Sequence, residues 1–319
     1  MKTIVKHIIY ALIVVSTIGL GGCKSAKLST ANEQYERGEY FDASKTYRKV
    51  YNKMTKREQR PQRGVVAYQM GMCYTKLNMA ARASAAFQNA VRYQYPDSIV
   101  YYYLGRALQA DGKYAQAVDA YETYLTFKPD DKLAKIGIEG CEHAIESKSK
   151  KTTRYVVKNA KLFNSRRADF APMYLDNKYD QLYFTSTTEK AMGDNKSEIT
   201  GMKKGDIYVA KKDEQGVWQR PEPVEGELNS DLDEGIVSFT PDGQTMYLTK
   251  ARREPNSSTS VEIYTSQRSE AQWSAPVKYE IISDTISAVG HPAVSPDGKW
   301  LYFCSDMPGG YGGKDIWKV

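Results

Sequence analysis

The sequence has few of the residues that usually carry catalysis or hold metals. It contains three histidines in 319 residues, and its cysteines, Cys23, Cys73, Cys141 and Cys304, are too far apart for a zinc site. The patterns Gly-x-Ser-x-Gly and His-Glu-x-x-His and a phosphate-binding loop are absent. We therefore expect no catalytic residue, no metal site and no cofactor, and we predict that the chain is not an enzyme.

Apolar runs long enough to cross a bilayer are also absent. The N-terminal run, Ile8–Leu20, has 13 residues, whereas a membrane-spanning helix needs about 20. Two lysines precede this run and Gly21-Gly22-Cys23 follows it, which is the order of a secretory signal peptide. The ending resembles the lipobox of bacterial lipoproteins, although an ordinary signal peptide with a chance cysteine is the alternative.

The lipobox resemblance implies a signal peptide at 1–22 and a lipidated N-terminus at 23–27, with acyl chains on Cys23. Several acyl chains on one residue would anchor the protein firmly, since each buried methylene contributes about 0.8 kcal/mol. Lys24 takes the place of the aspartate that signals inner-membrane retention. The resemblance therefore implies an outer-membrane lipoprotein that faces the periplasm.

Residues 28–147 follow a helical pattern with a repeat of 34 residues. Gly71 and Gly105 are 34 apart, as are Phe87 and Tyr121, and a displaced copy lies upstream. This period and these residue types resemble the tetratricopeptide repeat, in which small residues let two helices approach and large ones fill the gap to the next repeat. We predict an all-α solenoid of three repeats with a solvating helix at its end.

A solenoid of this family implies a groove lined by the first helix of each repeat. Carried over by position, the candidate groove residues are Val65, Tyr68, Met72, Ile99, Tyr102, Arg106 and Gln109. They are mainly apolar and aromatic, unlike the Lys and Asn residues with which the family clamps a C-terminal carboxylate. We expect an amphipathic segment of a protein partner as the guest, the alternative being that these side chains only pack between helices.

Residues 148–164 are expected to form a basic linker. Eight lysines and arginines and no acidic residue occur between 148 and 167. Such a run suits a solvated linker or anionic lipid headgroups, and secretion excludes nucleic acid as a partner. The sequence Asn164-Ser165 repeats at Asn229-Ser230. By analogy with this repeated sequence, Arg154–Val157 is a candidate outer strand that would complete the last β-sheet of the C-terminal part.

Residues 165–319 contain a repeated hairpin. Two copies turn at Thr240-Pro-Asp-Gly243 and Ser295-Pro-Asp-Gly298, with aromatic and β-branched residues on either side. A more altered copy covers 170–186, and the third strands that follow recur about every 55 residues. The unit resembles the PD40 repeat of TolB-type, WD40-like β-propellers. It predicts about three blades of an incomplete propeller. Completion of the propeller ring by oligomerisation of several copies is the alternative.

The predicted fold class is an α + β multidomain chain, with an all-α tetratricopeptide solenoid followed by an incomplete all-β propeller. This order is similar to outer-membrane lipoproteins of Bacteroidetes that continue into an OmpA-like domain and are linked to type IX secretion. The resemblance implies a non-enzymatic scaffold for envelope proteins. We expect the chain to be an N-terminal fragment, with peptidoglycan binding only if a C-terminal domain exists. The alternative is a propeller-gated hydrolase, similar to prolyl oligopeptidases, whose catalytic domain lies outside this sequence.

Overall fold

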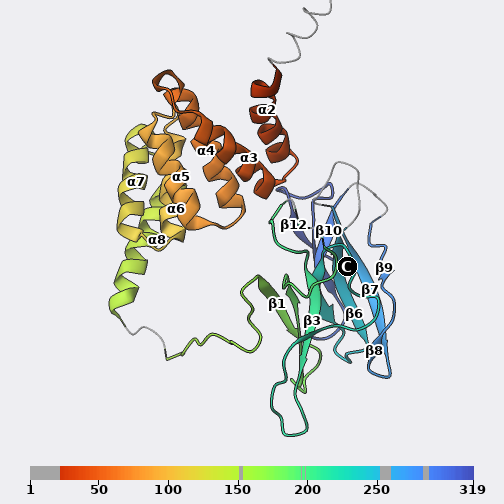
Figure 1. Cartoon of the computed structure of the whole chain (residues 1–319). Coiled ribbons are helices and arrows are strands. Elements are labelled where there is room, and N and C mark those ends of the chain that lie inside the picture. The colour runs from red at the N-terminus through yellow and green to blue at the C-terminus, as the bar shows by residue number, and fades with distance from the viewer. Residues whose placement is uncertain (1–21, 151–153, 195, 198, 252–259, 283–286) are drawn as a thin grey trace, which may run out of the picture. The chain divides into compact units, whose positions relative to one another are not determined.

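The computed structural model describes residues 22–150, 154–194, 196–197, 199–251, 260–282 and 287–319. The chain divides into two compact units, residues 1–155 with 198–200 and residues 156–197 with 201–319 (Figure 1). The expected signal peptide lies outside the described residues except for Gly22. The side chain of Cys23 is not described either, so its lipidation stays a prediction.

The first unit contains seven α-helices within the described residues. They are α2 (Gly22–Glu36), α3 (Tyr40–Lys53), α4 (Arg60–Lys76), α5 (Ala80–Arg92), α6 (Ile99–Ala110), α7 (Tyr114–Phe127) and α8 (Lys132–Ser149), with a 3₁₀ turn at Arg57–Gln59. Helix pairs α2–α3, α4–α5 and α6–α7 are the three repeats. Their internal turns each place one residue in the left-handed region, Gly38, Asn78 and Gly112, where glycine and asparagine end helices at the least steric cost.

Close packing between helices depends on glycines that face large rings. The ring of Tyr121 on α7 lies between Gly105 on α6 and Gly137 on α8, and a Cβ on either glycine would come within 2.8 Å of it. The ring of Phe87 lies equally close to Gly71. Tyr121 and Phe87 are almost fully buried. The predicted pairing of small and large positions therefore holds the solenoid together.

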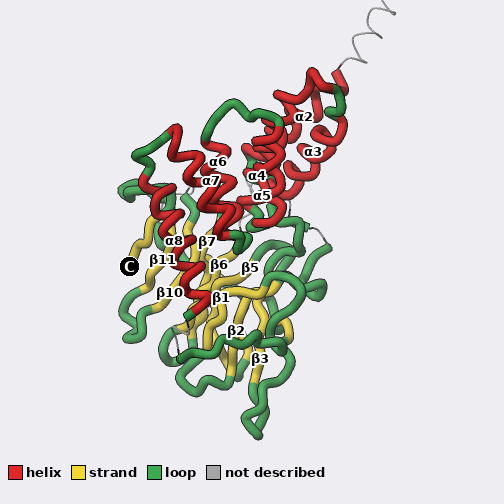
Figure 2. The backbone as a smooth tube through the Cα atoms, turned by 90° about the vertical axis from the view of Figure 1, so that its left-hand side faces the viewer, coloured by secondary structure: helices red, strands yellow, loops and turns green. Residues whose placement is uncertain are grey.

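The second unit consists of three antiparallel sheets in chain order. The first holds β1 (Asp169–Tyr174), β2 (Gln181–Ser186), β3 (Asp206–Lys211) and β4 (Glu222–Pro223). The second holds β5 (Glu234–Phe239), β6 (Thr245–Ala251), β7 (Val261–Ser269), β8 (Gln272–Trp273) and β9 (Val277–Lys278). The third holds β10 (Val289–Val294), β11 (Leu301–Ser305) and β12 (Asp315–Lys318). Figure 2 shows these strands in yellow as an open series.

The predicted turns form with the geometry that their residues require. Gly243 and Gly298 have φ of 67° and 70°, and their N–H groups donate to the carbonyls of Thr240 and Ser295 at 2.8 and 2.9 Å. In the altered first copy Tyr179 takes the left-handed position, with φ of 54°. That turn is longer by one residue, six between β1 and β2 against five between β5 and β6.

Neighbouring sheets contact each other through a repeated hydrogen bond. The N–H of Ile236 on β5 donates to Thr185 Oγ1 on β2 at 3.0 Å, and the N–H of His291 on β10 donates to Thr249 Oγ1 on β6 at 2.8 Å. Ile236 and His291 have positive φ, as does Ala171 at the same bulge of β1. Apolar cores lie between the first and second sheets and between the second and third. The second sheet therefore lies between the other two.

The linker differs from its prediction. Residues 154–157 form no strand, so this chain's third sheet is not completed by them. Helix α8 continues to Ser149, into the basic run that was expected to be linker, and α2 begins at Gly22 rather than at residue 28. Residues 154–157 have no strand partner within the described chain, because β12, the strand that the prediction pairs them with, belongs to the sheet at the far end of the series.

Asp206 at the start of β3 is fully buried, and within the described chain its Oδ1 has no hydrogen-bond partner. Its Oδ2 accepts from the N–H of Met192 at 2.7 Å. Burial, with a smaller contribution from the nearby carboxylate of Glu234, raises the pKa of Asp206 from 3.8 to about 6. Between these two values the folded state binds more protons than the unfolded state, so stability falls as pH rises through this window.

We predict that Asp206→Asn raises the free energy of unfolding of the second unit at pH 7 by about 2 kcal/mol and flattens its decline between pH 4 and pH 6. Denaturant unfolding at several pH values measures this. Asp315→Asn is the matched control, because Asp315 starts β12 at the equivalent position but is only half-buried. An unchanged pH profile in Asp206→Asn would contradict the assignment.

Candidate functional site: the inner face of the helical repeats

We call the surface of α4 and α6 that carries the predicted groove residues the inner face of the solenoid. On α4, Val65 keeps 40% of its surface exposed, while Tyr68 and Met72 are half-buried. On α6, Ile99, Tyr102 and Gln109 are half-buried and Arg106 is exposed. The seven residues predicted from sequence therefore lie on two helices, α4 and α6, and each is at least partly accessible.

The two tyrosines of this set also hold the repeats together. Tyr68 stacks on Tyr95 with ring centroids 4.2 Å apart and contacts Phe87 and Tyr103. Burial raises the pKa of Tyr68 far above its ordinary value, so its hydroxyl stays neutral. Replacing this ring would disturb packing as well as any binding. The tyrosines are therefore poor positions for a test of binding alone.

Tyr102 has a similar double role on α6. Its ring lies 6.0 Å from that of Tyr121 and 5.5 Å from that of Tyr124, both on α7. The guanidinium of Arg106 lies 5.9 Å from the Tyr102 ring, within cation–π range. Gln109 accepts a hydrogen bond from the hydroxyl of Tyr121 at 2.8 Å. This part of the inner face is a fixed aromatic surface with one cation beside it.

Helix α8 extends the inner face, which the sequence reading missed. Leu133 and Ile136 keep 63% and 60% of their surfaces exposed. They follow Ile99 and Tyr102 by one repeat length (133 − 99 = 34 and 136 − 102 = 34). The 34-residue spacing is the sequence signal that identifies these two positions, whereas the position of this helix after the last repeat predicts only a solvating helix. Apolar side chains thus cross α4, α6 and α8 in one register.

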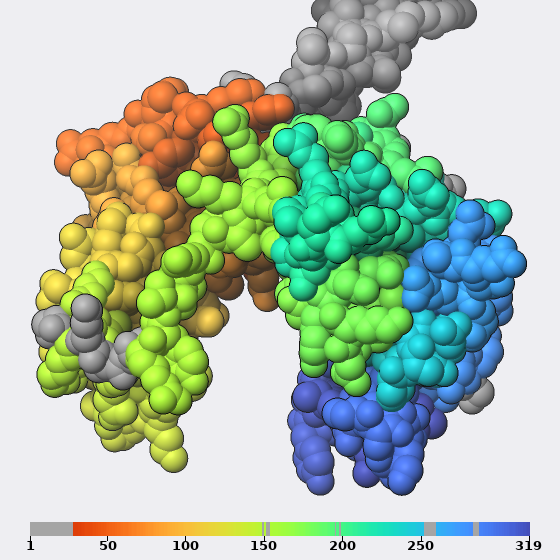
Figure 3. Space-filling model, turned by 90° about the horizontal axis from the view of Figure 1, so that it is seen from below, coloured from red at the N-terminus to blue at the C-terminus, as the bar shows by residue number. Residues whose placement is uncertain are grey.

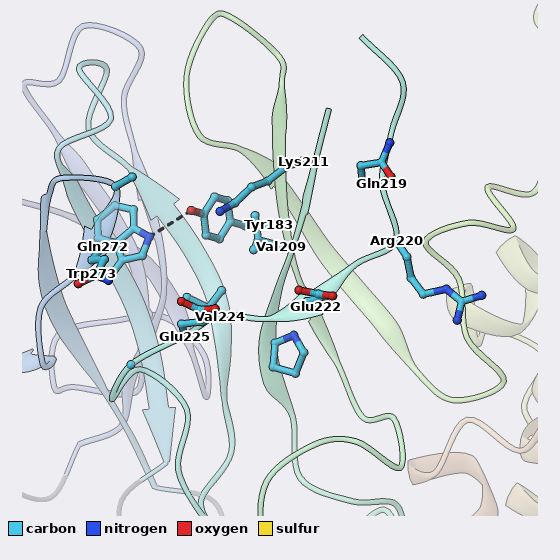
Figure 4. A pocket seen from close by; sticks show the side chains of 13 residues that line it. Tyr183, Val209, Lys211, Gln219, Arg220, Glu222, Val224, Glu225, Gln272 and Trp273 are labelled. Atoms are coloured by element: carbon cyan, nitrogen blue, oxygen red, sulfur yellow. Dashed lines mark hydrogen bonds between the residues drawn. The ribbon is translucent and has the colours of Figure 1, made fainter. Parts of the chain in front are cut away.

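A hollow of about 620 Å³ lies in the second unit, between the first and second sheets. The indole N–H of Trp273 donates to the hydroxyl of Tyr183 at 3.1 Å across it (Figure 4). Its lining includes Lys211 and Arg220 together with Glu222. The two aromatic residues are engaged with each other and the charges are of both signs, so this hollow is polar and has no evident selectivity for one class of ligand.

No group of three or more His, Cys, Asp or Glu side chains in the described residues is arranged to hold a metal ion. None of the described helices combines the length and apolar character needed to span a membrane. The inner face of the helical unit is therefore the best-defined candidate site in the described chain.

Comparison with known families identifies the helical repeats. The family model described as Tetratricopeptide repeat matches residues 66–98 and 100–130. These ranges overlap the pairs α4–α5 and α6–α7, so two of the three predicted repeats are confirmed. A comparison with curated proteins gave no match.

Solved structures with similar helices include several tetratricopeptide domains. The first TPR of Spaghetti (RPAP3), bound to the HSP90 peptide SRMEEVD, is 22% identical and covers 39% of this chain and 94% of its own, with a TM-score of 0.34. The Sgt2 TPR domain from Aspergillus fumigatus is 19% identical, covers 44% and 91%, and has a TM-score of 0.34. MamA protein is 17% identical, covers 43% and 100%, and has a TM-score of 0.24.

Proposed function

We propose that this chain, which carries tetratricopeptide repeats, is a non-enzymatic scaffold whose inner helical face binds an apolar segment of a protein partner. The observation that supports this most is the row of exposed apolar side chains in register on α4 and α8, above all Leu133 and Ile136. Large aliphatic side chains exposed together on one surface commonly mark an interaction site. An amphipathic helix placing its apolar side in the groove is the mode of recognition that fits.

The aromatic surface beside these apolar side chains favours binding of an apolar peptide segment over binding of a C-terminal carboxylate. The positions that would hold a C-terminal carboxylate carry Tyr68 and Met72 on α4. Among the seven candidate groove residues, Tyr68 and Met72 carry no positive charge and Arg106 on α6 is the one that does. A peptide with several aliphatic residues at helical spacing therefore gains more from this face than an acidic C-terminus does.

We predict that Ile136→Asp weakens partner capture at least tenfold, because a carboxylate in the groove must be desolvated when an apolar segment binds. Ile145→Asp is the matched control, since Ile145 is an exposed isoleucine on the same helix but outside the 34-residue register. Capture from envelope extracts and the far-ultraviolet circular dichroism of both variants should be measured. Equal capture by the two variants would count against the inner face.

The proposal also covers the fold of the second unit, the location of the protein and the class of its partners. The three sheets are blades of a TolB-type propeller, which the repeated Thr-to-backbone bonds between sheets support. The protein is anchored to the periplasmic side of the outer membrane through lipid on Cys23, on the resemblance of its sequence to a lipobox. Its partners are envelope proteins, with which it forms an envelope assembly or a type IX secretion assembly. In a longer chain, a C-terminal domain would tether the protein to peptidoglycan.

Anchoring is tested by Cys23→Ala, which we expect to move the protein from the membrane fraction to the soluble periplasmic fraction. Acyl chains would then be missing, and with them the free energy of burying their methylenes, about 0.8 kcal/mol each. Fractionation followed by immunoblotting measures the distribution. Retention of the variant in the outer membrane would remove lipid anchoring from the account.

A further inference from the structure

We propose that a hollow between the second and third helical repeats binds the guanidinium group of an arginine that a protein partner presents. The hollow has a volume of about 770 Å³ and lies where the end of α5, the start of α6 and the end of α7 meet. These repeats follow one another from orange to yellow in the space-filling view (Figure 3). The proposal concerns a different surface from the exposed apolar side chains on α4 and α8, and it does not depend on binding there.

The gap between the first and second repeats contains an arginine of this chain. The guanidinium of Arg63 on α4 lies 4.3 Å from the ring centroid of Tyr51 on α3 and 4.8 Å from that of Tyr93 at the end of α5. Both distances are within cation–π range. Arg63 Nε is buried and has no hydrogen-bond partner within the described chain. Contact with the two rings, rather than a hydrogen bond to Nε, therefore accounts for the position of this group.

The gap between the second and third repeats has equivalent positions but no arginine. The 34-residue repeat places Asp97 at the position of Arg63 and Phe127 at that of Tyr93 (97 − 63 = 34 and 127 − 93 = 34). Both Asp97 and Phe127 line the hollow. A short carboxylate thus takes the place of a long cationic side chain. The space that a guanidinium fills in the first gap remains open in the second.

The side chains around the hollow suit a cation. The N–H of Ile99 donates to Asp97 Oδ1 at 2.9 Å, and among the described residues Asp97 Oδ2 has no hydrogen-bond partner. Phe127 keeps 57% of its surface exposed. Its ring stacks on that of Tyr101, with centroids 6.2 Å apart. A carboxylate oxygen and an accessible aromatic ring are therefore available to one ligand group.

The helix ends at the hollow have the same preference. Helix α5 ends at Arg92 and α7 at Phe127, and the last carbonyls of a helix carry partial negative charge that favours a cation. Helix α6 begins here, and Asp97 already accepts from its first turn. Lys128 opposes a cation, but it is exposed and forms no ion pair in the part of the chain that the structure describes. Its ammonium can therefore turn to the solvent.

Arginine fits this combination better than lysine does. A guanidinium is planar, so it can lie on an aromatic ring and still donate N–H groups to a carboxylate in its own plane. An ammonium is a compact and more strongly hydrated charge, and it gains less from contact with a ring. The contact of Arg63 with two tyrosines shows the same mode of binding within this chain.

Titration with N-acetyl-arginine methylamide, followed by nuclear magnetic resonance of the full chain with Cys23→Ser, tests the proposal. We expect saturable shifts of the amide resonances of Asp97, Ile99 and Phe127. The affinity should be about fivefold higher than for N-acetyl-citrulline methylamide, whose uncharged ureido group has nearly the shape of a guanidinium. Equal affinity for the two compounds, or no saturable shift at these residues, would overturn the proposal.

Two aspartate variants separate the hollow from general attraction of a cation to carboxylates. Asp97→Asn should bind the arginine compound about fivefold more weakly, because asparagine can still accept from the N–H of Ile99 but carries no charge. Asp130→Asn is the matched control, since Asp130 is an exposed aspartate beyond the end of α7 and does not line the hollow. It should bind like the parent. Circular dichroism shows whether both variants are folded, and equal affinities of the two variants would overturn the proposal.

Discussion

Gly137→Ala should lower the free energy of unfolding of the helical unit by about 2 kcal/mol, although alanine is the better helix former by about 1 kcal/mol. A Cβ at this position would lie 2.6 Å from the ring of Tyr121. That ring is nearly fully buried, and Gly105 lies against another part of it. The ring has no room to retreat, so the helices must separate. Denaturant unfolding followed by circular dichroism at 222 nm measures the loss.

Gly140→Ala is the matched control for this prediction. Gly140 lies one turn further along α8, and its new Cβ would meet only the flexible end of Gln109, at 3.1 Å from Nε2. We expect this variant to be as stable as the parent or more stable, by up to about 1 kcal/mol from helix propensity. Equal effects of the two substitutions would show that the Tyr121 contact does not limit how closely α7 and α8 approach.

Lys250→Met should lower the free energy of unfolding of the second unit by about 3 kcal/mol at pH 7.5. The side chain of Glu234 is fully buried, and Lys250 Nζ lies 3.0 Å from its Oε1. Without the ammonium, a carboxylate remains in the interior, and among the described residues Ser230 donates to it through its N–H and its hydroxyl. Burial already raises the pKa of Glu234, and removal of Lys250 should raise it further.

The pH dependence of Lys250→Met separates this cause from simple loss of packing. A raised carboxyl pKa means that stability is lost as pH rises through it, so the deficit of the variant should be larger at pH 8 than at pH 5. The double variant Glu234→Gln with Lys250→Met should recover most of the loss, because no buried charge remains. A double variant as unstable as the single one would contradict the electrostatic explanation.

The repeats and turns could be predicted from the sequence because single residue types determine them locally. Gly243 and Gly298 adopt the left-handed conformation that the Pro-Asp-Gly pattern requires. The spacing of Gly71 and Gly105 identified two repeats that the family model matches. In both cases a short pattern specifies a short-range contact.

Features that depend on long-range packing were not predictable in the same way. Positive φ at Ile236 and His291 occurs at bulges whose N–H groups donate to threonines on a neighbouring sheet, and a β-branched residue such as Ile236 disfavours that conformation. The burial of Asp206 likewise depends on residues brought in from other parts of the chain. The candidate site was found only in part, because Leu133 and Ile136 were assigned to a solvating helix despite their 34-residue register.

Site-specific photo-cross-linking tests the central claim, partner binding by the inner face, most directly. A photoreactive phenylalanine analogue at Ile136 should give covalent adducts with one or a few envelope proteins in living cells, and the same analogue at Ile145 should give adducts at least tenfold weaker. Mapping the partner's linked peptide should reveal aliphatic residues at helical spacing. Adducts of equal strength at the two positions, or none at Ile136, would contradict the account.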